Sequence, residues 1–83
     1  MEPKYEVLKF EFGPDRSEDP IELGTHNEDE IREFLTVLSA VGYETAEFDE
    51  HMSRYGYAWV GPSWDMAFGP TTEWWPTYLI RRV

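Results

Sequence analysis

The chain has no cysteine among its 83 residues. A disulfide framework, a thiolate metal site and a cysteine nucleophile are therefore excluded, and the composition fits a reducing compartment. No apolar run approaches the roughly 20 residues that a membrane-spanning helix requires. The opening residues Met1-Glu2-Pro3-Lys4 do not have the architecture of a signal peptide. From these absences we expect a cytoplasmic protein that does not associate with membranes.

Motifs of catalysis and cofactor binding are also missing. The four serines are not part of a nucleophile-elbow motif, and the glycines do not have the spacing of a phosphate-binding loop. Only His26 and His51 are candidates for a general base. His51 stands beside Asp49 and Glu50, but adjacent residues are a weak pattern for metal ligands. We therefore expect no enzymatic activity, no cofactor and no bound metal.

Basic residues are few: the chain has seven Lys and Arg against 17 Asp and Glu. Its formal net charge is therefore −10. Residues 1–50 contain fifteen of the acids and four basic residues, a net charge of −11, whereas residues 51–83 have a net charge of +1. A chain this acidic is repelled by DNA, RNA and anionic lipid, so direct binding to nucleic acid or to a membrane is disfavoured. Its electrostatic field favours a basic protein as partner.

The composition predicts a folded chain, because 41% hydrophobic and 17% aromatic residues are too many for intrinsic disorder. A chain of this length has room for one core, so we expect a single compact domain over residues 1–83. Residues 4–12 alternate as a strand, and the face with Leu8, Phe10 and Phe12 is the better candidate for the core. Residues 21–23 are a weak second strand. A last strand covers residues 77–83, after Pro76, which cannot donate to a sheet ladder.

The clearest element is a helix over about residues 28–41. Asn27 is a preferred N-cap residue, and Glu30 occupies the position that closes a capping box. Gly42 supplies the left-handed conformation that commonly ends a helix. The apolar residues of one helical face form the stripe of a half-buried helix; they are Ile31, Phe34, Leu35, Leu38 and Val41.

Residues 43–60 allow two interpretations. We prefer a β-hairpin in which residues 43–48 and 55–60 flank a turn near Asp49–Ser53. The alternative places Phe48, Met52 and Tyr55 at positions i, i+4 and i+7 of a second short helix. The chain as a whole is predicted to have an α+β fold, with an antiparallel sheet of about four strands and one main α-helix packed on one face.

Acidic residues are concentrated at both ends of the main predicted helix. One group lies in its first turns, where each acid favours the helix macrodipole by about 0.3–1 kcal/mol: Glu28, Asp29, Glu30 and Glu33. A second group follows the helix, where no dipole accounts for it: Glu44, Glu47, Asp49 and Glu50. One interpretation is a continuous negative surface that approximates a track of phosphates, and the other is an ordinary solvated surface.

Aromatic residues are concentrated toward the other end of the chain, with eight of the fourteen in residues 51–83. A small core can cover only part of this surface, so we expect some of the tryptophans to be exposed. Exposed tryptophans are typical anchors of protein interfaces, and they also stack on sugars. Trp64 and Trp74 are our candidates for such anchors.

These observations favour a small acidic binding protein, an inhibitor or adaptor that docks a negative face on a basic protein or complex that binds nucleic acid. In size and charge the chain resembles small phage and plasmid inhibitors of nucleic-acid enzymes, such as anti-CRISPR proteins and DNA mimics, although it shares no motif with them. The alternative is an accessory or carbohydrate-binding domain with an aromatic platform, and both a monomer and a homodimer stay open. The predicted partner-binding residues are Glu28, Asp29, Glu33, Glu44, Glu47, Asp49, Glu50, Trp64 and Trp74.

Overall fold

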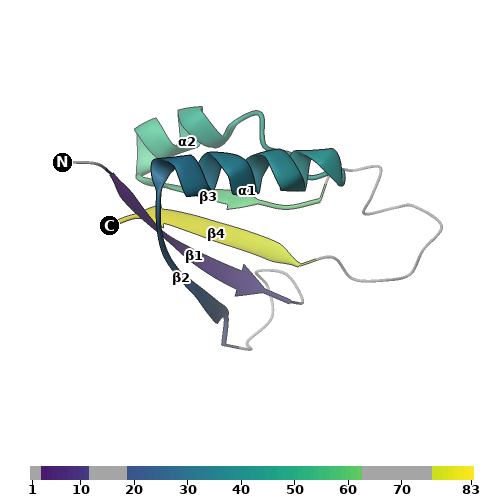
Figure 1. Ribbon diagram of the computed structural model, residues 1–83, viewed down its shortest axis with the longest axis horizontal. Helices are drawn as coiled ribbons and strands as arrows, with labels where there is room; N and C mark the ends of the chain where they lie inside the picture. The colour runs from purple at the N-terminus through teal and green to yellow at the C-terminus, as the bar shows by residue number, and fades with distance from the viewer. Residues whose placement is uncertain (1–2, 12–18, 63–75) are drawn as a thin grey trace.

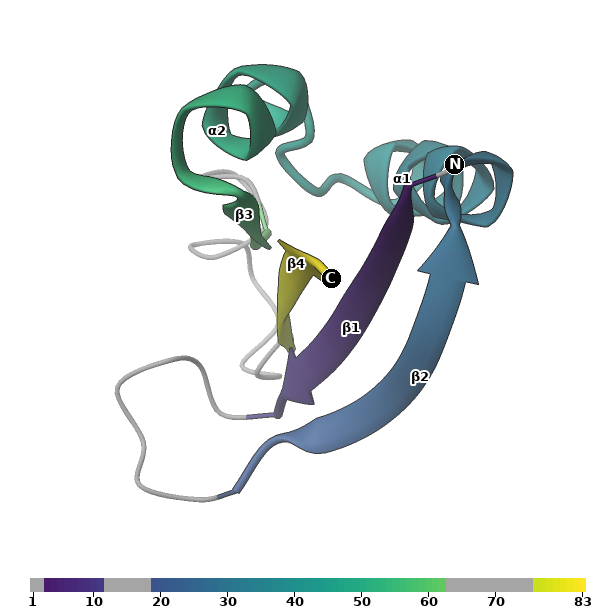
Figure 2. The same ribbon diagram turned by 90° about the vertical axis from the view of Figure 1, so that its left-hand side faces the viewer.

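The elements of the fold are shown in Figure 1, a computed structural model that describes residues 3–11, 19–62 and 76–83. They are, in chain order, β1 (Lys4–Phe10), β2 (Ile21–Asn27), α1 (Glu28–Ala40), α2 (Phe48–Tyr55), β3 (Tyr57–Val60) and β4 (Thr77–Arg82). The strands form an antiparallel sheet in the order β2-β1-β4-β3. Both helices lie on the same side of this sheet (Figures 1 and 2). The predicted α+β fold, with a four-stranded antiparallel sheet and one main helix packed on one face, is confirmed.

Helix α1 begins and ends where its sequence signals indicate. The Asn27 side chain accepts a hydrogen bond of 2.8 Å from the Glu30 N–H, and the Glu30 carboxylate accepts one of 3.0 Å from the Asn27 N–H. This reciprocal pair is the predicted capping box. Gly42 has the left-handed φ of 105° that follows the helix end. In the predicted apolar stripe, Ile31, Leu35 and Leu38 are buried and Phe34 is partly buried, whereas Val41, which lies past the helix, is 51% exposed.

The preferred β-hairpin over residues 43–60 is wrong, and the alternative with a second helix is confirmed. Phe48 and Met52 lie one turn apart on α2 and are both buried in the core. The helix dipole is complemented by acids in the first turn and by Arg54 in the last. Gly56, with a φ of 79°, ends the helix in the left-handed conformation and leads directly into β3.

The face of β1 chosen for the core is also wrong. Tyr5 and Val7, on the other face, pack in the core beneath the helices, while Leu8 is buried outside that cluster and Phe10 is half-buried. Phe12 lies outside the described residues. Both faces of this strand contain apolar side chains, so the alternation within β1 does not show which face packs against the helices. The selection comes from pairing, because Val7 lies beside the fully buried Ile80 of β4.

Tyr43 connects the helical layer to the start of β4. Its ring is buried, its hydroxyl donates a 2.7 Å hydrogen bond to the carbonyl of Pro76, and its ring centroid lies 5.9 Å from that of Tyr78. Burial, with a smaller contribution from Tyr78, raises the pKa of Tyr43 to about 12 from an ordinary value of 10.0. The folded protein therefore retains a proton at alkaline pH that the unfolded chain has lost.

We expect Tyr43→Phe to flatten the loss of stability at alkaline pH. The raised pKa gives the folded state an advantage that is complete below pH 10.0 and disappears as the pH rises toward about 12. The variant lacks this titration, and the loss of its hydrogen bond costs roughly 0.5–1.5 kcal/mol at neutral pH. Urea unfolding at several pH values measures both effects. Tyr55→Phe, at an exposed position, is the control; an equally steep alkaline decline in Tyr43→Phe would contradict the prediction.

Candidate functional site

The acidic residues predicted to bind a partner lie in the helical layer. Residues 27–56, which include both helices and their connection, contain eight acids and two arginines, a net charge of −6. We call this segment the acidic layer. The strands of the sheet contain two acids and four basic residues, a net charge of +2. Among the helices and strands, folding therefore sets a negative helical layer against a weakly positive sheet.

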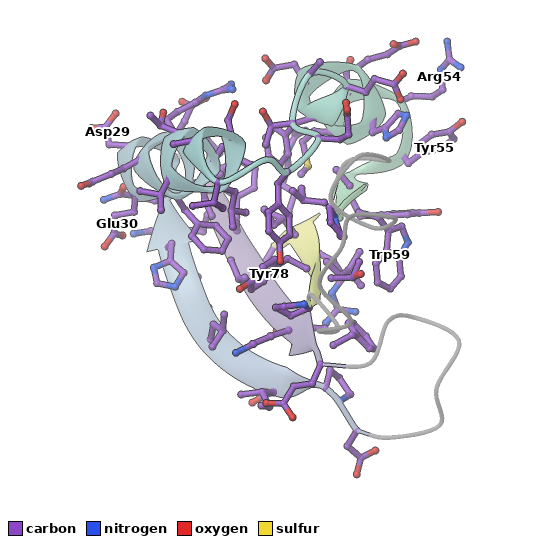
Figure 3. All side chains as sticks on the ribbon, turned by 90° about the vertical axis from the view of Figure 1, so that its right-hand side faces the viewer. Asp29, Glu30, Arg54, Tyr55, Trp59 and Tyr78 are labelled. Carbon is purple, nitrogen blue, oxygen red and sulfur yellow. The ribbon has the colours of Figure 1, made fainter. Side chains whose placement is uncertain are left out.

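All seven acidic residues predicted to contact a partner are exposed. Figure 3 shows Asp29 projecting from α1 away from the sheet, with Glu30 beside it at the start of the helix. Asp29 and Glu33 are four residues apart on α1, so their carboxylates follow one line along the helix. The surface of the acidic layer is thus available to a partner.

Arg32 joins the two helices of the acidic layer. One guanidinium nitrogen of Arg32 lies 2.6 Å from the Asp49 carboxylate on α2 and 3.7 Å from the Glu28 carboxylate on α1. The hydrogen bond from Arg32 lowers the pKa of Asp49. The same guanidinium lies 5.7 Å from the centre of the Phe48 ring. Exposed ion pairs contribute at most about 1 kcal/mol, so the main effect of Arg32 is to fix where the acids of α2 lie relative to those of α1.

The remaining acids differ in whether a basic side chain lies near them. Glu47 lies 3.3 Å from His51, and Glu50 lies 3.4 Å from Arg54, each one helical turn further along the chain. Within the described part of the chain, no cationic side chain lies at ion-pair distance from the other three predicted acids, Asp29, Glu33 and Glu44. Among the seven acids, these three carboxylates would be stabilised most by a cation from a partner.

The two tryptophans predicted as anchors, Trp64 and Trp74, lie outside the described residues. The structure instead exposes Trp59 and Tyr57 of β3, each at 42%. The sequence of β3 indicated this exposure. Side chains alternate along the strand, so Tyr57 and Trp59 lie on the face opposite to that of Ala58 and Val60, which are buried. Figure 3 shows Trp59 pointing away from the helices, and its ring centroid lies 5.2 Å from that of Phe10.

A cleft of about 350 Å³ lies between α2 and β3, which we call the β3 cleft. Its lining includes the buried apolar side chains Phe48 and Val60, and the exposed carboxylates Glu44 and Glu47. Trp59 also lines it. A cleft that combines carboxylates with apolar and aromatic groups is suited to a ligand that is both cationic and partly apolar.

A second cleft, of about 230 Å³, lies between α1 and β2 and is mostly apolar. Its polar residue His26 already donates a 2.7 Å hydrogen bond through Nε2 to the carbonyl of Leu23, and its other ring nitrogen faces Glu30 at 3.9 Å. The hydrogen bond lies within β2, and the contact with Glu30 reaches the first turn of α1. The mostly apolar lining of this cleft offers little to a charged ligand.

Within residues 3–11, 19–62 and 76–83, no three His, Asp or Glu side chains are grouped as a metal site requires. Neither described helix is long and apolar enough to cross a membrane. Comparisons with protein-family models, with curated proteins and with solved structures found no match to this chain. Its function has to be inferred from the acidic layer and the β3 cleft.

Proposed function

We propose that this protein is a small non-enzymatic binding protein, an inhibitor or adaptor that docks its acidic layer on a basic protein that handles nucleic acid. One observation carries the proposal: residues 27–56 gather eight acids against two arginines. Like charges held close together destabilise the free protein, and lysines or arginines of a partner relieve that repulsion. The absence of cysteine fits a site of action in the cytoplasm.

The arrangement of the acids suits a partner that normally binds phosphates. Carboxylates at i and i+4 of a helix, such as Asp29 and Glu33, follow the axis at about 6 Å spacing, whereas phosphates of one DNA strand repeat at about 3.4 Å. The match is approximate, but the sign and the linear order of the charges are the same. A protein of this kind inhibits by occupying the basic surface that nucleic acid would otherwise bind.

The acidic layer is organised before any partner binds. The burial of Phe48 and Met52 holds α2 in place, the Arg32–Asp49 pair links it to α1, and the capping box fixes the start of α1. Fixed charges are presented at little further entropic cost, which favours affinity. They also steer diffusion, so the expected mode of binding is fast association that weakens as salt rises.

A tagged chain used as bait in a lysate of the source organism or its host tests this proposal. Bound proteins are eluted in steps of increasing salt and identified by mass spectrometry, and a parallel sample is eluted with DNA. We expect one basic nucleic-acid-handling protein that leaves as salt rises and that DNA displaces. The bait variant Asp29→Lys/Glu33→Lys should recover much less of it. A partner that resists both salt and DNA, or no specific partner at all, would contradict the proposal.

A further inference from the structure

β3 lies at an edge of the sheet, and among the described residues its outer side is paired at one end only. There the Glu44 N–H donates a 3.0 Å hydrogen bond to the Gly61 carbonyl, next to a bridge between Tyr43 and Pro62. At the other end the Arg82 N–H donates to the Gly56 carbonyl, so the even-numbered residues of β3 bond to β4. The main-chain groups of Tyr57 and Trp59 therefore face outward, where no other described residue pairs with them.

The opposite edge of the sheet is less suited to pairing. In β2, Gly24 has a φ of 88°, and the register between β1 and β2 shifts between Glu6 and Leu8. Irregularities of this kind bend an edge strand and discourage the addition of another chain. The pairing of β3 with β4 has no such shift over its four residue pairs. Of the two edges, β3 is thus the more regular template for an added strand.

The β3 cleft opens beside this edge and has the character of a receptor for a basic side chain. Lysine and arginine have an apolar stem and a charged head. The stem matches the apolar lining from Phe48 and Val60. The head matches the carboxylate of Glu44 and that of Glu47, which also lies 3.3 Å from His51 in the same lining. Trp59 also borders the cleft, although its ring lies against that of Phe10. A volume of about 350 Å³ lies near the lower limit of small-molecule pockets, roughly 300–1,000 Å³, and suits a single side chain.

We propose that an extended basic segment of the partner adds to the outer edge of β3 and places one lysine or arginine in the β3 cleft. The inference rests on the proposed function, because it specifies which part of the basic partner is bound and where. Main-chain hydrogen bonds to Tyr57 and Trp59 hold the segment, and the cleft selects its charge. Glu44 contributes a carboxylate with no cationic partner among the described residues.

The probe is the capped tripeptide acetyl-Val-Arg-Val-amide, titrated into the ¹⁵N-labelled protein and followed by NMR. We expect chemical-shift changes confined to the amides of residues 44–48 and 57–61, with a Kd on the order of 1 mM, as befits a contact of this size. The same peptide with norleucine in place of arginine keeps the apolar stem and lacks the charge, so it should bind at least about tenfold more weakly. Shifts elsewhere, or equal binding of both peptides, would overturn the inference.

Two variants with the same loss of charge separate the cleft from the rest of the acidic layer. Glu44→Gln/Glu47→Gln should weaken binding of the arginine peptide about tenfold, whereas Asp29→Asn/Glu33→Gln, outside the cleft, should change it by less than about twofold. The same pair is then tested against the partner captured from lysate. If Asp29→Lys/Glu33→Lys loses that partner and Glu44→Gln/Glu47→Gln does not, this inference fails and the proposed function stands. If all variants retain the partner, the proposed function fails as well.

Discussion

Replacing Asp29 and Glu33 together by lysine is expected to weaken the complex with the basic partner by about 10- to 100-fold. Neither carboxylate has a cation at ion-pair distance within the described part of the chain, so each is available to the partner. A charge pair at an exposed interface contributes roughly 0.2–1 kcal/mol, and reversal replaces that attraction by repulsion. The sum for two sites is roughly 0.8–4 kcal/mol, and the stated 10- to 100-fold change in Kd, about 1.4–2.8 kcal/mol, is the middle of that range. Surface plasmon resonance should show most of it as slower association.

The matched control is Glu11→Lys/Glu22→Lys. Both residues are exposed, they lie outside the acidic layer, and the change in net charge is the same. We expect this control to keep most of the affinity. If it loses as much as Asp29→Lys/Glu33→Lys, the partner responds to net charge alone and the acidic layer is not its binding surface. Both variants should remain folded, since all four positions are exposed and the acid in the first turn of α1 contributes only about 0.3–1 kcal/mol.

Ile31→Ala is expected to cause the largest loss of stability, about 2–4 kcal/mol. Ile31 is 1% exposed and belongs to the core cluster beneath α1. Shortening the side chain removes buried apolar surface and leaves a cavity. For a domain of this size the loss corresponds to a decrease in Tm of about 10–25 °C. Circular dichroism during heating and urea titration measures it.

Val37→Ala is the control on the same helix, because Val37 is 57% exposed. Its effect should stay within about 0.5 kcal/mol, since alanine is the better helix former and little packing is lost. Equal losses in the two variants would mean that α1 does not pack through the face that contains Ile31. Because Ile31 is buried beneath α1 and takes no part in its exposed surface, Ile31→Ala should leave partner affinity unchanged below its melting temperature.

The parts of the fold that could be predicted are those with local causes. Helix α1 was predicted to within a residue at each end because Asn27, Glu30 and Gly42 act on backbone groups a few residues away. Helix α2 has only eight residues and lacks a side-chain N-cap bond. Its helical period is too short to exclude a strand from sequence alone. What stabilises the helical form is the burial of Phe48 and Met52 against distant parts of the chain.

The inner face of β1 depends on partners far along the chain. Val7 and Leu8 are both apolar, and only the pairing of Val7 with Ile80 shows which of them faces the helices. The exposure of Trp59 also depends on which face of its strand the helices cover. Its alternation with Ala58 was evident in the sequence, but the sequence did not show which side of β3 the helices would cover.

The candidate site was predicted in part. The seven acids were expected to be exposed, and they are. Their individual environments could not be predicted, because the Arg32–Asp49 pair joins residues seventeen positions apart on two helices, one of which was expected to be a hairpin. The β3 cleft could not be predicted either, because it exists only once α2 packs beside β3. Its residues Glu44 and Glu47 were nevertheless among the predicted partner-binding acids.

The most direct test of the central claim is the Kd of the captured partner as a function of salt concentration. If the acidic layer docks on a basic surface, Kd should rise at least about tenfold between roughly 0.05 and 0.3 M salt, where screening shortens the range of charge interactions. Asp29→Lys/Glu33→Lys should show a shallower dependence than the unaltered protein. A Kd that does not change with salt, or an identical dependence in the variant, would contradict docking through the acidic layer.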